Sequence, residues 1–501
     1  MGVIRLKGTI DPNKTWEFND KLLAQGGMKD VFMSPDRSHV VGFFRSSVDP
    51  AGKERLNSIV GRYFKGIYEG QGGDFWKTRF CWPVDIVTHE GRIGVVAPAY
   101  PNNFFFKIGS IKNDALEIKG KDKEGKWFAS TKVRRMLSAE ERGEWKDYLR
   151  ICLNISRAVR RMHAAGLAHS DLSYKNVLVD PTTGEACLID IDGLVVPGKF
   201  PPDVVGTPDF IAPEVLSTLN LPLTDQKRKL PNQNTDLHAL AVLNYMYLLF
   251  RHPLKGGKIW DSDPGRDVEL SMGSKALFIE HPTDNSNRVK ASELADYEKI
   301  WGDPARMPMT VCGPYLADLF KKAFVDGLHD PTKRPIANDW EVALVKTMDL
   351  LQRCSNKSCE MKWYIFDNTS APSCPYCRTP YSGTLPIFNF YSKRADKTFK
   401  PDNQRLMVWD NQSLFPYHVN RKIFPNEILR QEDKKRVGYF QFNGGKWWFF
   451  NEALNSLQDV TDNTNKVDVP AGGKVELKEG TLLLLSSEEG GRLAQIQLVG
   501  K

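Results

Sequence analysis

The sequence predicts an α+β fold over about its first 350 residues, followed by a small cysteine-rich segment and an all-β region. In the first part, apolar residues recur at helical spacing in residues 54–67 and form an almost unbroken run in residues 237–250, with strand-like runs between them. Four of the eight cysteines lie between residues 354 and 377. After residue 386, short alternating runs are separated by Gly-Gly and Asn-Gly turns, which is typical of antiparallel strands.

Composition and charge fit a soluble protein of several domains. The 501 residues exceed one ordinary domain, and 41% hydrophobic with 26% charged residues is usual for globular chains. The first 16 residues lack the apolar core of a secretory signal, and the run 237–250 is too short to span a bilayer. We therefore expect a cytoplasmic protein with no membrane partner. The net charge of +8 is scattered, which does not favour nucleic acid as a partner.

The N-terminal strands enclose a glycine turn. Residues 23–32 read LAQGGMKDVF, a second turn follows at 34–37, and an apolar run occupies 39–44. Gly26 and Gly27 would let backbone amides approach phosphate oxygens, which predicts a nucleotide-binding role. The same pair could instead simply close a hairpin.

The most informative motifs come next, in a fixed order. Residues 169–176 read HSDLSYKN, residues 190–193 read DIDG, and residues 206–214 read GTPDFIAPE. Asp236 lies near the start of the apolar helix, and Arg334 follows an Asp-Pro-Thr-Lys turn. This series resembles the signature set of eukaryotic-like protein kinases. The resemblance covers about residues 15–350 and implies a bilobal fold, with an N-lobe of about 15–100 and a C-lobe of about 101–350.

The resemblance assigns chemical roles to the matching residues. Phosphoryl transfer depends mostly on positioning and charge neutralisation. Asp171 is the expected carboxylate that accepts the substrate hydroxyl proton, and Asn176 and Asp190 are the expected ligands of Mg²⁺, which binds with ATP. Lys175 would steady the γ-phosphate.

The resemblance also implies scaffold contacts and a choice of substrate. An ion pair is expected between Glu214 and Arg334, and Asp236 is expected to brace the catalytic loop. Thr207, in Gly-Thr-Pro, is similar to serine/threonine kinases, whereas the position of Lys175 is similar to tyrosine kinases. We favour serine/threonine specificity.

The chain departs from the family where the ATP-binding lysine normally lies. The expected third strand, residues 39–44, reads HVVGFF and has no lysine. Lys29 instead occupies the third glycine position of the glycine loop, with Ala24 at the first, as in the with-no-lysine kinases. The hypothesis is that Lys29 replaces the missing strand lysine; the alternative is a solvated loop lysine. Glu54, early in the predicted helix, is named as its partner.

Two further departures concern the motifs themselves. Ser170 replaces the arginine that in this family binds an activation-loop phosphate, which predicts that activity is not gated that way. Asp192 follows Asp190 by two residues. It is either a second metal ligand or a solvated neighbour, and the solvated neighbour is favoured.

The cysteine cluster has the spacing of a metal site. Cys354 and Cys359 form one pair and Cys374 and Cys377 form another, with a 14-residue spacer between the pairs. Four thiolates in two pairs suit structural, tetrahedral Zn²⁺, and the pattern resembles a zinc ribbon over residues 351–383. The gap within the first pair is wider than usual for that family. The span contains only Lys357 and Lys362 as basic residues, which favours protein docking over DNA binding.

Residues 386–501 predict an all-β sandwich. The stretch 447–451, WWFFN, and the later strands are similar to forkhead-associated domains. The Glu452-Ala453 pair stands where that family has Gly-Thr, so phosphothreonine binding is not predicted with the fold. Arg421 and Ser413 are candidate remnants of phosphate ligands, and Trp447 and Trp448 are favoured as core residues over exposed ones.

Three functions compete on these observations. The preferred one is an active, ATP- and Mg²⁺-dependent protein kinase, the second is an ATP-binding pseudokinase adaptor that organises a complex, and the third is a small-molecule kinase on the same fold. The segment 206–214 argues against the third. The whole arrangement also resembles bacterial kinases associated with tellurite-resistance gene clusters. That resemblance implies a von Willebrand A-domain protein, the expected substrate, and a metal-dependent Ser/Thr phosphatase as partners.

Overall fold

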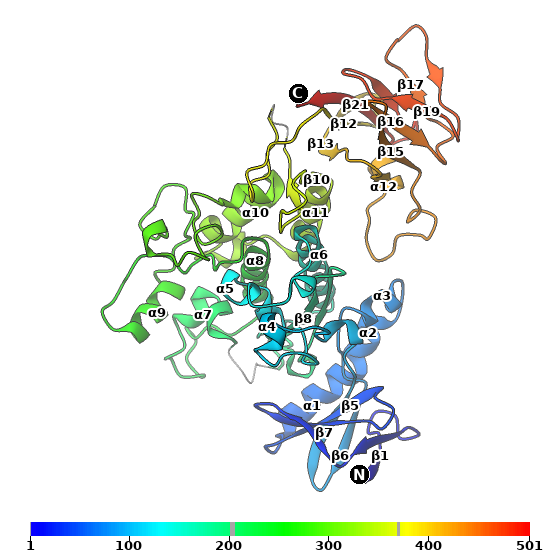
Figure 1. Cartoon of the computed structure of the whole chain (residues 1–501). Helices are drawn as coiled ribbons and strands as arrows, with labels where there is room; N and C mark the ends of the chain where they lie inside the picture. The colour runs from blue at the N-terminus through cyan, green and yellow to red at the C-terminus, as the bar shows by residue number, and fades with distance from the viewer. Residues whose placement is uncertain (1, 201–205, 368–370, 501) are drawn as a thin grey trace. The chain divides into compact units, whose positions relative to one another are not determined.

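The computed structural model describes residues 2–200, 206–367 and 371–500 and divides into two compact units (Figure 1). The first unit comprises residues 1–143, 147–308 and 318–341, and the second comprises 144–146, 309–317 and 342–501. Part of the segment between the DIDG and APE motifs (201–205) and part of the predicted zinc ribbon (368–370) lie outside the described residues.

Five antiparallel strands form the N-terminal sheet of the first unit in the order β3-β4-β5-β7-β6. Their bounds are β3 Leu22–Gln25, β4 Lys29–Met33, β5 His39–Phe44, β6 Asp85–His89 and β7 Arg92–Pro98. One face packs Val41 and Phe43 against Trp16 and Phe18, because alternate side chains of a strand point to the same face. The sheet thereby fixes Lys29 at the start of β4.

A short hairpin precedes this sheet. Strands β1 (Val3–Lys7) and β2 (Thr15–Asn19) pair antiparallel, so β1 lies before the expected domain start at residue 15 and pairs across it. The buried carboxylate of Asp85 accepts from Trp16 Nε1 at 2.8 Å and from the Ile10 amide at 2.9 Å. These bonds tie the hairpin to β6.

One helical segment covers the other face of the sheet. It consists of α1 (Pro50–Ser58), a π-helical turn η1 (Ile59–Tyr63) and α2 (Phe64–Tyr68). Asp49 caps its first turn by accepting from the Gly52 amide at 2.7 Å, and Pro50 fits the first helical position. Leu56 and Val60 pack against Ile86 and Val95, which confirms a helix in the region predicted at 54–67.

The rest of the first unit is mainly helical and positions the catalytic loop. The hairpin β8 (Val177–Asp180) and β9 (Glu185–Leu188) closes through a turn with Gly184 at φ +77°. Helix α8 (Gln233–Leu249) begins with a capping box at Asn232 and is buried along nearly its whole length, as its apolar sequence predicts. The other α-helices between residues 100 and 350 are α4 Ile111–Asp114, α5 Thr131–Arg134, α6 Trp145–Ala164, α7 Pro213–Leu216, α9 Pro264–Met272, α10 Pro314–Lys321 and α11 Ala337–Met348.

The second unit contains a small hairpin and two larger sheets. Strands β10 (Leu351–Arg353) and β11 (Trp363–Ile365) form the hairpin beside the cysteines. The larger sheets have the orders β13-β12-β21-β20-β17-β18 and β14-β15-β16-β19. Their longer strands are β12 Leu385–Lys393, β13 Phe399–Met407, β15 Gly438–Asn443, β16 Lys446–Asn451 and β21 Arg492–Val499.

Aromatic rings join these two sheets. Phe388 of β12 lies 5.0 Å from Phe440 of β15 and 6.5 Å from Phe449 of β16, measured between ring centroids. Trp447 is buried and Trp448 is half-buried, as alternation along β16 requires. Arg421 lies at the surface 3.8 Å from Asp402, and Ser413 pairs with Tyr439 in the two-residue strand β14.

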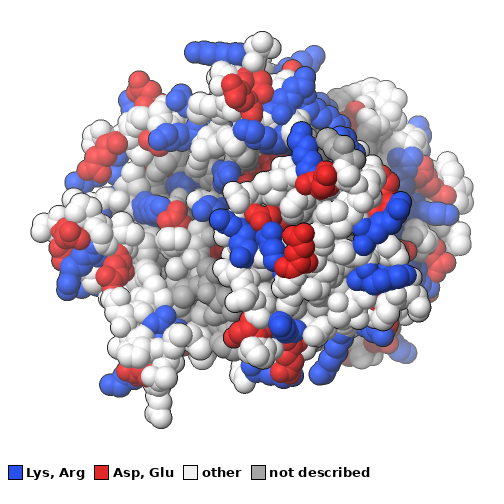
Figure 2. All heavy atoms as spheres, turned by 90° about the horizontal axis from the view of Figure 1, so that it is seen from below, with Lys and Arg blue, Asp and Glu red and all other residues white. Residues whose placement is uncertain are grey.

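The surface carries charges of both signs. On the face shown in Figure 2, lysine and arginine side chains are intermixed with aspartate and glutamate. The net charge of +8 therefore does not gather into one basic field on this face. Within the described part of the chain, none of the helices combines the length and the apolarity needed to cross a bilayer.

Candidate active site and cysteine cluster

The carboxylate of Asp171 is held from both sides. Oδ1 accepts from the Thr207 amide at 2.6 Å and from Thr207 Oγ1 at 2.8 Å, and Oδ2 accepts from Asn176 Nδ2 at 2.9 Å. Thr207 also lies 3.2 Å from the buried Ser173 hydroxyl. These bonds orient the carboxylate before any substrate arrives, which is the preorganisation that proton acceptance requires. Sequence motifs pointed to Asp171, but not to Thr207 as its clamp.

Asp236 braces the catalytic loop from the start of α8. Its carboxylate accepts from the His169 amide at 2.7 Å, from the Ser170 amide at 3.2 Å, and lies 3.0 Å from His163 Nε2. Ser170 has a left-handed φ of +64°, a conformation that costs energy for a non-glycine residue unless neighbours hold it. The brace predicted for Asp236 is therefore confirmed.

Glu214 and Arg334 form the second predicted scaffold contact. Two parallel hydrogen bonds join the guanidinium to the carboxylate, Nη1 to Oε1 at 2.8 Å and Nη2 to Oε2 at 2.7 Å. The Arg334 side chain is buried and also donates to the Gly327 carbonyl at 2.9 Å. A bidentate pair of this kind fixes both position and orientation, so it anchors α7.

Asn176 and Asp190 lie at the two ends of the β8–β9 hairpin. The Ile189 amide donates to the Asn176 carbonyl at 3.0 Å, which brings the two segments together. The Nδ2 group of Asn176 donates hydrogen bonds to Asp171, so the side-chain oxygen Oδ1 is the atom available to bind a cation. The Asp190 side chain is 54% exposed. Two oxygen ligands of this kind fit Mg²⁺, which prefers carboxylate and carbonyl oxygens.

Lys29 reaches this site across 161 residues of sequence. Its Nζ lies 2.6 Å from Asp192 Oδ2 and 3.4 Å from Asp190 Oδ1. Burial lowers the pKa of Lys29, but the attraction of Asp192 and Asp190 outweighs burial and leaves the pKa raised above 10.5. The ammonium therefore stays charged at neutral pH. A charged lysine beside Asp190 would meet the phosphates of a nucleotide whose Mg²⁺ that carboxylate binds.

Gly42 makes room for this lysine. A Cβ at Gly42 would lie 3.4 Å from Lys29 Cδ and 3.9 Å from Lys29 Cβ, so the aliphatic stem of Lys29 crosses the face of β5 at this glycine. Gly42 lies in the strand where the family's lysine was sought. Sequence reasoning noted the missing lysine but not the glycine.

The expectations for two acidic residues, Asp192 and Glu54, need correction. Asp192 is buried rather than solvated, because its carboxylate forms the shorter ion pair with Lys29. Glu54 does not pair with Lys29 in this structure. Its side chain is 61% exposed, and its carboxylate contacts Lys199 at 3.0 Å. The core-facing positions of α1 are taken by residues such as Leu56.

Among the remaining predicted residues, Gly26 and Lys175 bond to residues of the site through their backbone amides. Gly26 and Gly27 form the exposed turn between β3 and β4, closed by a 2.8 Å bond from the Gly26 amide to the Lys29 carbonyl. Lys175 is exposed on the catalytic loop, and its backbone amide donates to Ser173 Oγ at 3.3 Å. Its ammonium makes no contact with Asp171 within the described part of the chain.

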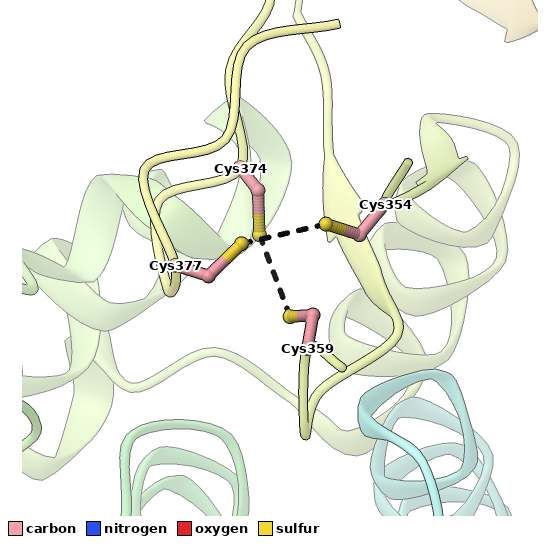
Figure 3. A group of neighbouring side chains, drawn as sticks. All are labelled: Cys354, Cys359, Cys374 and Cys377. Atoms are coloured by element: carbon pink, nitrogen blue, oxygen red, sulfur yellow. Dashed lines mark hydrogen bonds between the residues drawn. The ribbon is translucent and has the colours of Figure 1, made fainter. Parts of the chain in front are cut away.

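The four clustered cysteines point toward one another from two loops (Figure 3). All four Sγ atoms lie within 4.8 Å of one another, with Cys354–Cys377 at 3.5 Å and Cys359–Cys374 at 3.9 Å. A tetrahedron of sulfurs about 2.3 Å from one zinc ion has edges of about 3.8 Å, so the spacing fits that ion.

Backbone hydrogen bonds shape both loops. The Cys354 amide donates to the Lys362 carbonyl at 2.8 Å, and the Cys374 amide donates to the Thr379 carbonyl at 2.9 Å. The hydrogen bond between Cys374 and Cys359 lowers the pKa of Cys359 and raises that of Cys374, because one sulfur keeps the proton that the other accepts. A thiolate is the form that binds a metal, so metal binding would release this proton.

Comparisons with known proteins point to the same family as the motifs. Residues 126–293 match the protein kinase domain family. Over 210 residues it is 25% identical to serine/threonine-protein kinase PknD of Chlamydia trachomatis serovar D, a match that spans 33% of this chain and 21% of PknD. Over 167 residues it is 30% identical to calcium-dependent protein kinase SK5 of Glycine max, which spans 30% of each chain.

A third relative has both specificities in its name. The chain is 36% identical over 189 residues to a dual serine/threonine and tyrosine protein kinase of Apis mellifera, covering 36% of this chain and 17% of that protein. The matches thus span between about a sixth and a third of the length of these curated relatives. Lys29 lies outside the family match at 126–293, so its role depends on the geometry above.

Proposed function

We propose that this chain is an ATP- and Mg²⁺-dependent protein kinase that phosphorylates serine or threonine hydroxyls of another protein. The observation that carries the proposal is the joint placement of Asp171, Asn176 and Asp190 around the catalytic loop, with the Lys29 ammonium beside Asp190. The match to the protein kinase domain supports the same class of reaction.

The residues divide the chemistry among them. Asp171, clamped by Thr207 and Asn176, accepts the proton from the attacking hydroxyl. Asn176 and Asp190 would hold Mg²⁺, which neutralises phosphate charge when it is bound. Lys29 adds a second positive charge on the phosphate side. Thr207 supports serine/threonine specificity because it bonds both Asp171 and Ser173, the residue that stands where serine/threonine kinases usually have lysine.

A library of serine, threonine and tyrosine peptides tests this proposal. The peptides are incubated with γ-labelled ATP and Mg²⁺ and then analysed for phosphoamino acids. Phosphoserine or phosphothreonine should form, and its formation should require both ATP and Mg²⁺. Phosphotyrosine alone would overturn the specificity. Label absent from every peptide and candidate partner, with ATP still bound, would favour the pseudokinase adaptor, which the absence of a lysine in β5 supports.

We also propose that the four cysteines bind one structural Zn²⁺ in a zinc ribbon spanning about 351–383. The sulfur spacing supports the proposal, and the ion would supply folding energy to a segment too small for a core of its own. Metal analysis should find one zinc per chain, lost in Cys374→Ser and retained in the control Cys81→Ser. Full zinc content in Cys374→Ser would contradict the site.

The remaining proposals concern docking. The two sheets after residue 385 are proposed as a forkhead-associated-like β sandwich that, with the ribbon, docks the substrate. The resemblance to tellurite-resistance-cluster kinases suggests a von Willebrand A-domain protein as substrate and a Ser/Thr phosphatase as a further partner in the cytoplasm. Removal of residues 351–501 should then raise KM for that protein without changing kcat for a short peptide. Equal KM values for the full and truncated chains would contradict docking.

A further inference from the structure

The site holds one lysine between two aspartates that differ sharply in exposure. The Asp192 side chain is 9% exposed and lies 2.6 Å from Lys29 Nζ, whereas the Asp190 side chain is 54% exposed and lies 3.4 Å away. A buried carboxylate is costly unless it is paired, and among the described residues the Lys29 ammonium is the group that hydrogen-bonds Asp192. The two carboxylates therefore serve different purposes.

We infer that Asp192 is the positioning residue for Lys29, taking the part that a helix glutamate plays toward the ATP-binding lysine of protein kinases. This inference rests on the proposed kinase function and names a residue of the same site. The buried carboxylate of Asp192 binds the Lys29 ammonium, and the exposed carboxylate of Asp190 remains available to a metal ion.

The helix next to the sheet offers no competing carboxylate. From Pro50 to Tyr68 the one acidic residue is Glu54, and its 61% exposed side chain contacts Lys199, whereas Lys29 contacts Asp190 and Asp192. A lysine placed at the start of β4 rather than in β5 approaches the site from a different strand. Its acidic partner then comes from the turn η5 (Ile191–Gly193), which follows Asp190 directly.

Backbone features near Asp192 and near Lys29 favour the ion pair between them. Asp190 adopts a left-handed φ of +60°, and the Gly193 amide bonds back to its carbonyl at 3.4 Å, so the turn directs the next aspartate inward. On the other side, the stem of Lys29 lies over Gly42. The Lys29 side chain is only 18% exposed, so it keeps one orientation more readily than a solvated lysine.

A double-mutant cycle on stability tests the contact without requiring activity. Asp192→Asn and Lys29→Met should each lower the thermal unfolding midpoint, and the double variant should lose clearly less than the two losses added together. Additive losses would overturn the ion pair. The exposed carboxylate variant Asp74→Asn, combined with Lys29→Met, is the matched control and should be additive.

A second experiment tests the role. Asp192→Asn should lower kcat for peptide phosphorylation by on the order of tenfold to a hundredfold, the size expected from losing a hydrogen bond between charged groups. The loss should shrink to less than about twofold in a Lys29→Met background, and Asp192→Glu should recover part of it. These outcomes would support a residue that acts through Lys29.

Three results would overturn the role. Recovery of Asp192→Asn at high Mg²⁺ would make Asp192 a metal ligand. A large loss in Glu54→Gln with none in Asp192→Asn would return the role to the helix. Unchanged kcat in Asp192→Asn, with the stability coupling present, would leave a purely structural ion pair. An inactive unaltered protein would instead count against the proposed kinase function, while the stability cycle would still decide the contact.

Discussion

The two sides of the candidate site differ in how closely they follow the protein-kinase pattern. The hydroxyl side is the catalytic loop around Asp171, which would face the substrate hydroxyl. Here Asp171 and Asn176 are hydrogen-bonded to each other and Asp236 braces the loop, in line with the family motifs. On the phosphate side, around Lys29 and Asp190, β5 has no lysine, Lys29 extends from the start of β4 past Gly42, and its buried partner is Asp192. The comparison teaches that short motifs specify the loop around Asp171, whereas the contact that holds Lys29 joins residues far apart in the chain.

The largest expected effect comes from the hydroxyl side. Asp171→Asn keeps the shape and removes the proton acceptor, so kcat should fall by about a thousandfold. ATP affinity, measured by fluorescent nucleotide titration, should change little because Asp171 contacts Thr207 and Asn176 rather than Lys29. A matching loss of ATP affinity would show that the two sides are not separable.

The buried residue His252, which contacts the 206–214 segment, should make the free energy of unfolding depend on pH. His252 is buried, its Nε2 donates to the Asp209 carbonyl at 2.9 Å, and its Nδ1 accepts from the Leu254 amide at 3.1 Å. Burial lowers the pKa of His252 from 6.5 to about 4. The unfolded chain therefore takes up a proton first, and stability should be lost as pH falls from 6.5 toward 4, by about 3 kcal/mol in all.

Thermal unfolding across this pH range checks the expectation. His252→Gln should flatten the fall in the unfolding midpoint between pH 6.5 and 4, whereas His281→Gln, at a more accessible histidine, should leave the slope unchanged. An unchanged slope in His252→Gln would mean that other groups cause the acid sensitivity.

The smallest expected effect comes from substitutions at Gly42, which test how the Lys29 side chain is held. Gly42→Val would press a branched side chain against Lys29, and should raise KM for ATP about fivefold, equivalent to about 1 kcal/mol of overpacking. Gly42→Ala should cost less, because its Cβ would reach ordinary contact at 3.4 Å from Lys29 Cδ. Gly61→Ala, in open space on the helix, is the control. Equal KM values for all three variants would mean that the stem of Lys29 does not cross Gly42.

The sequence predicted the contacts of Asp171 and Asn176 better than the contacts of Lys29, and the reason is physical. The loop holding Asp171 and Asn176 is local, and the brace from Asp236 is part of a recurring pattern, so order along the chain was informative. The partner of Lys29 lies 163 residues away and depends on which carboxylate the turn η5 directs inward. Helical spacing placed Glu54 in a helix but could not tell that it faces solvent.

The second unit shows the same division. Cysteine spacing predicted that the four thiols converge, because each pair is held by a short local loop. Strands after residue 386 were predicted from alternating apolar runs. The pairing of β12 with β21, whose partners lie a hundred residues or more apart, could not be read from either strand, because register depends on partners that alternation does not identify.

The most direct test of the account is labelling with γ-labelled ATP and Mg²⁺, comparing the unaltered chain with Lys29→Ala, Asp171→Ala and the exposed-lysine control Lys77→Ala. The account predicts label on the unaltered chain and on Lys77→Ala, and loss of label in both Lys29→Ala and Asp171→Ala. Label retained at the full level in Lys29→Ala would contradict the claim that this lysine replaces the one missing from β5.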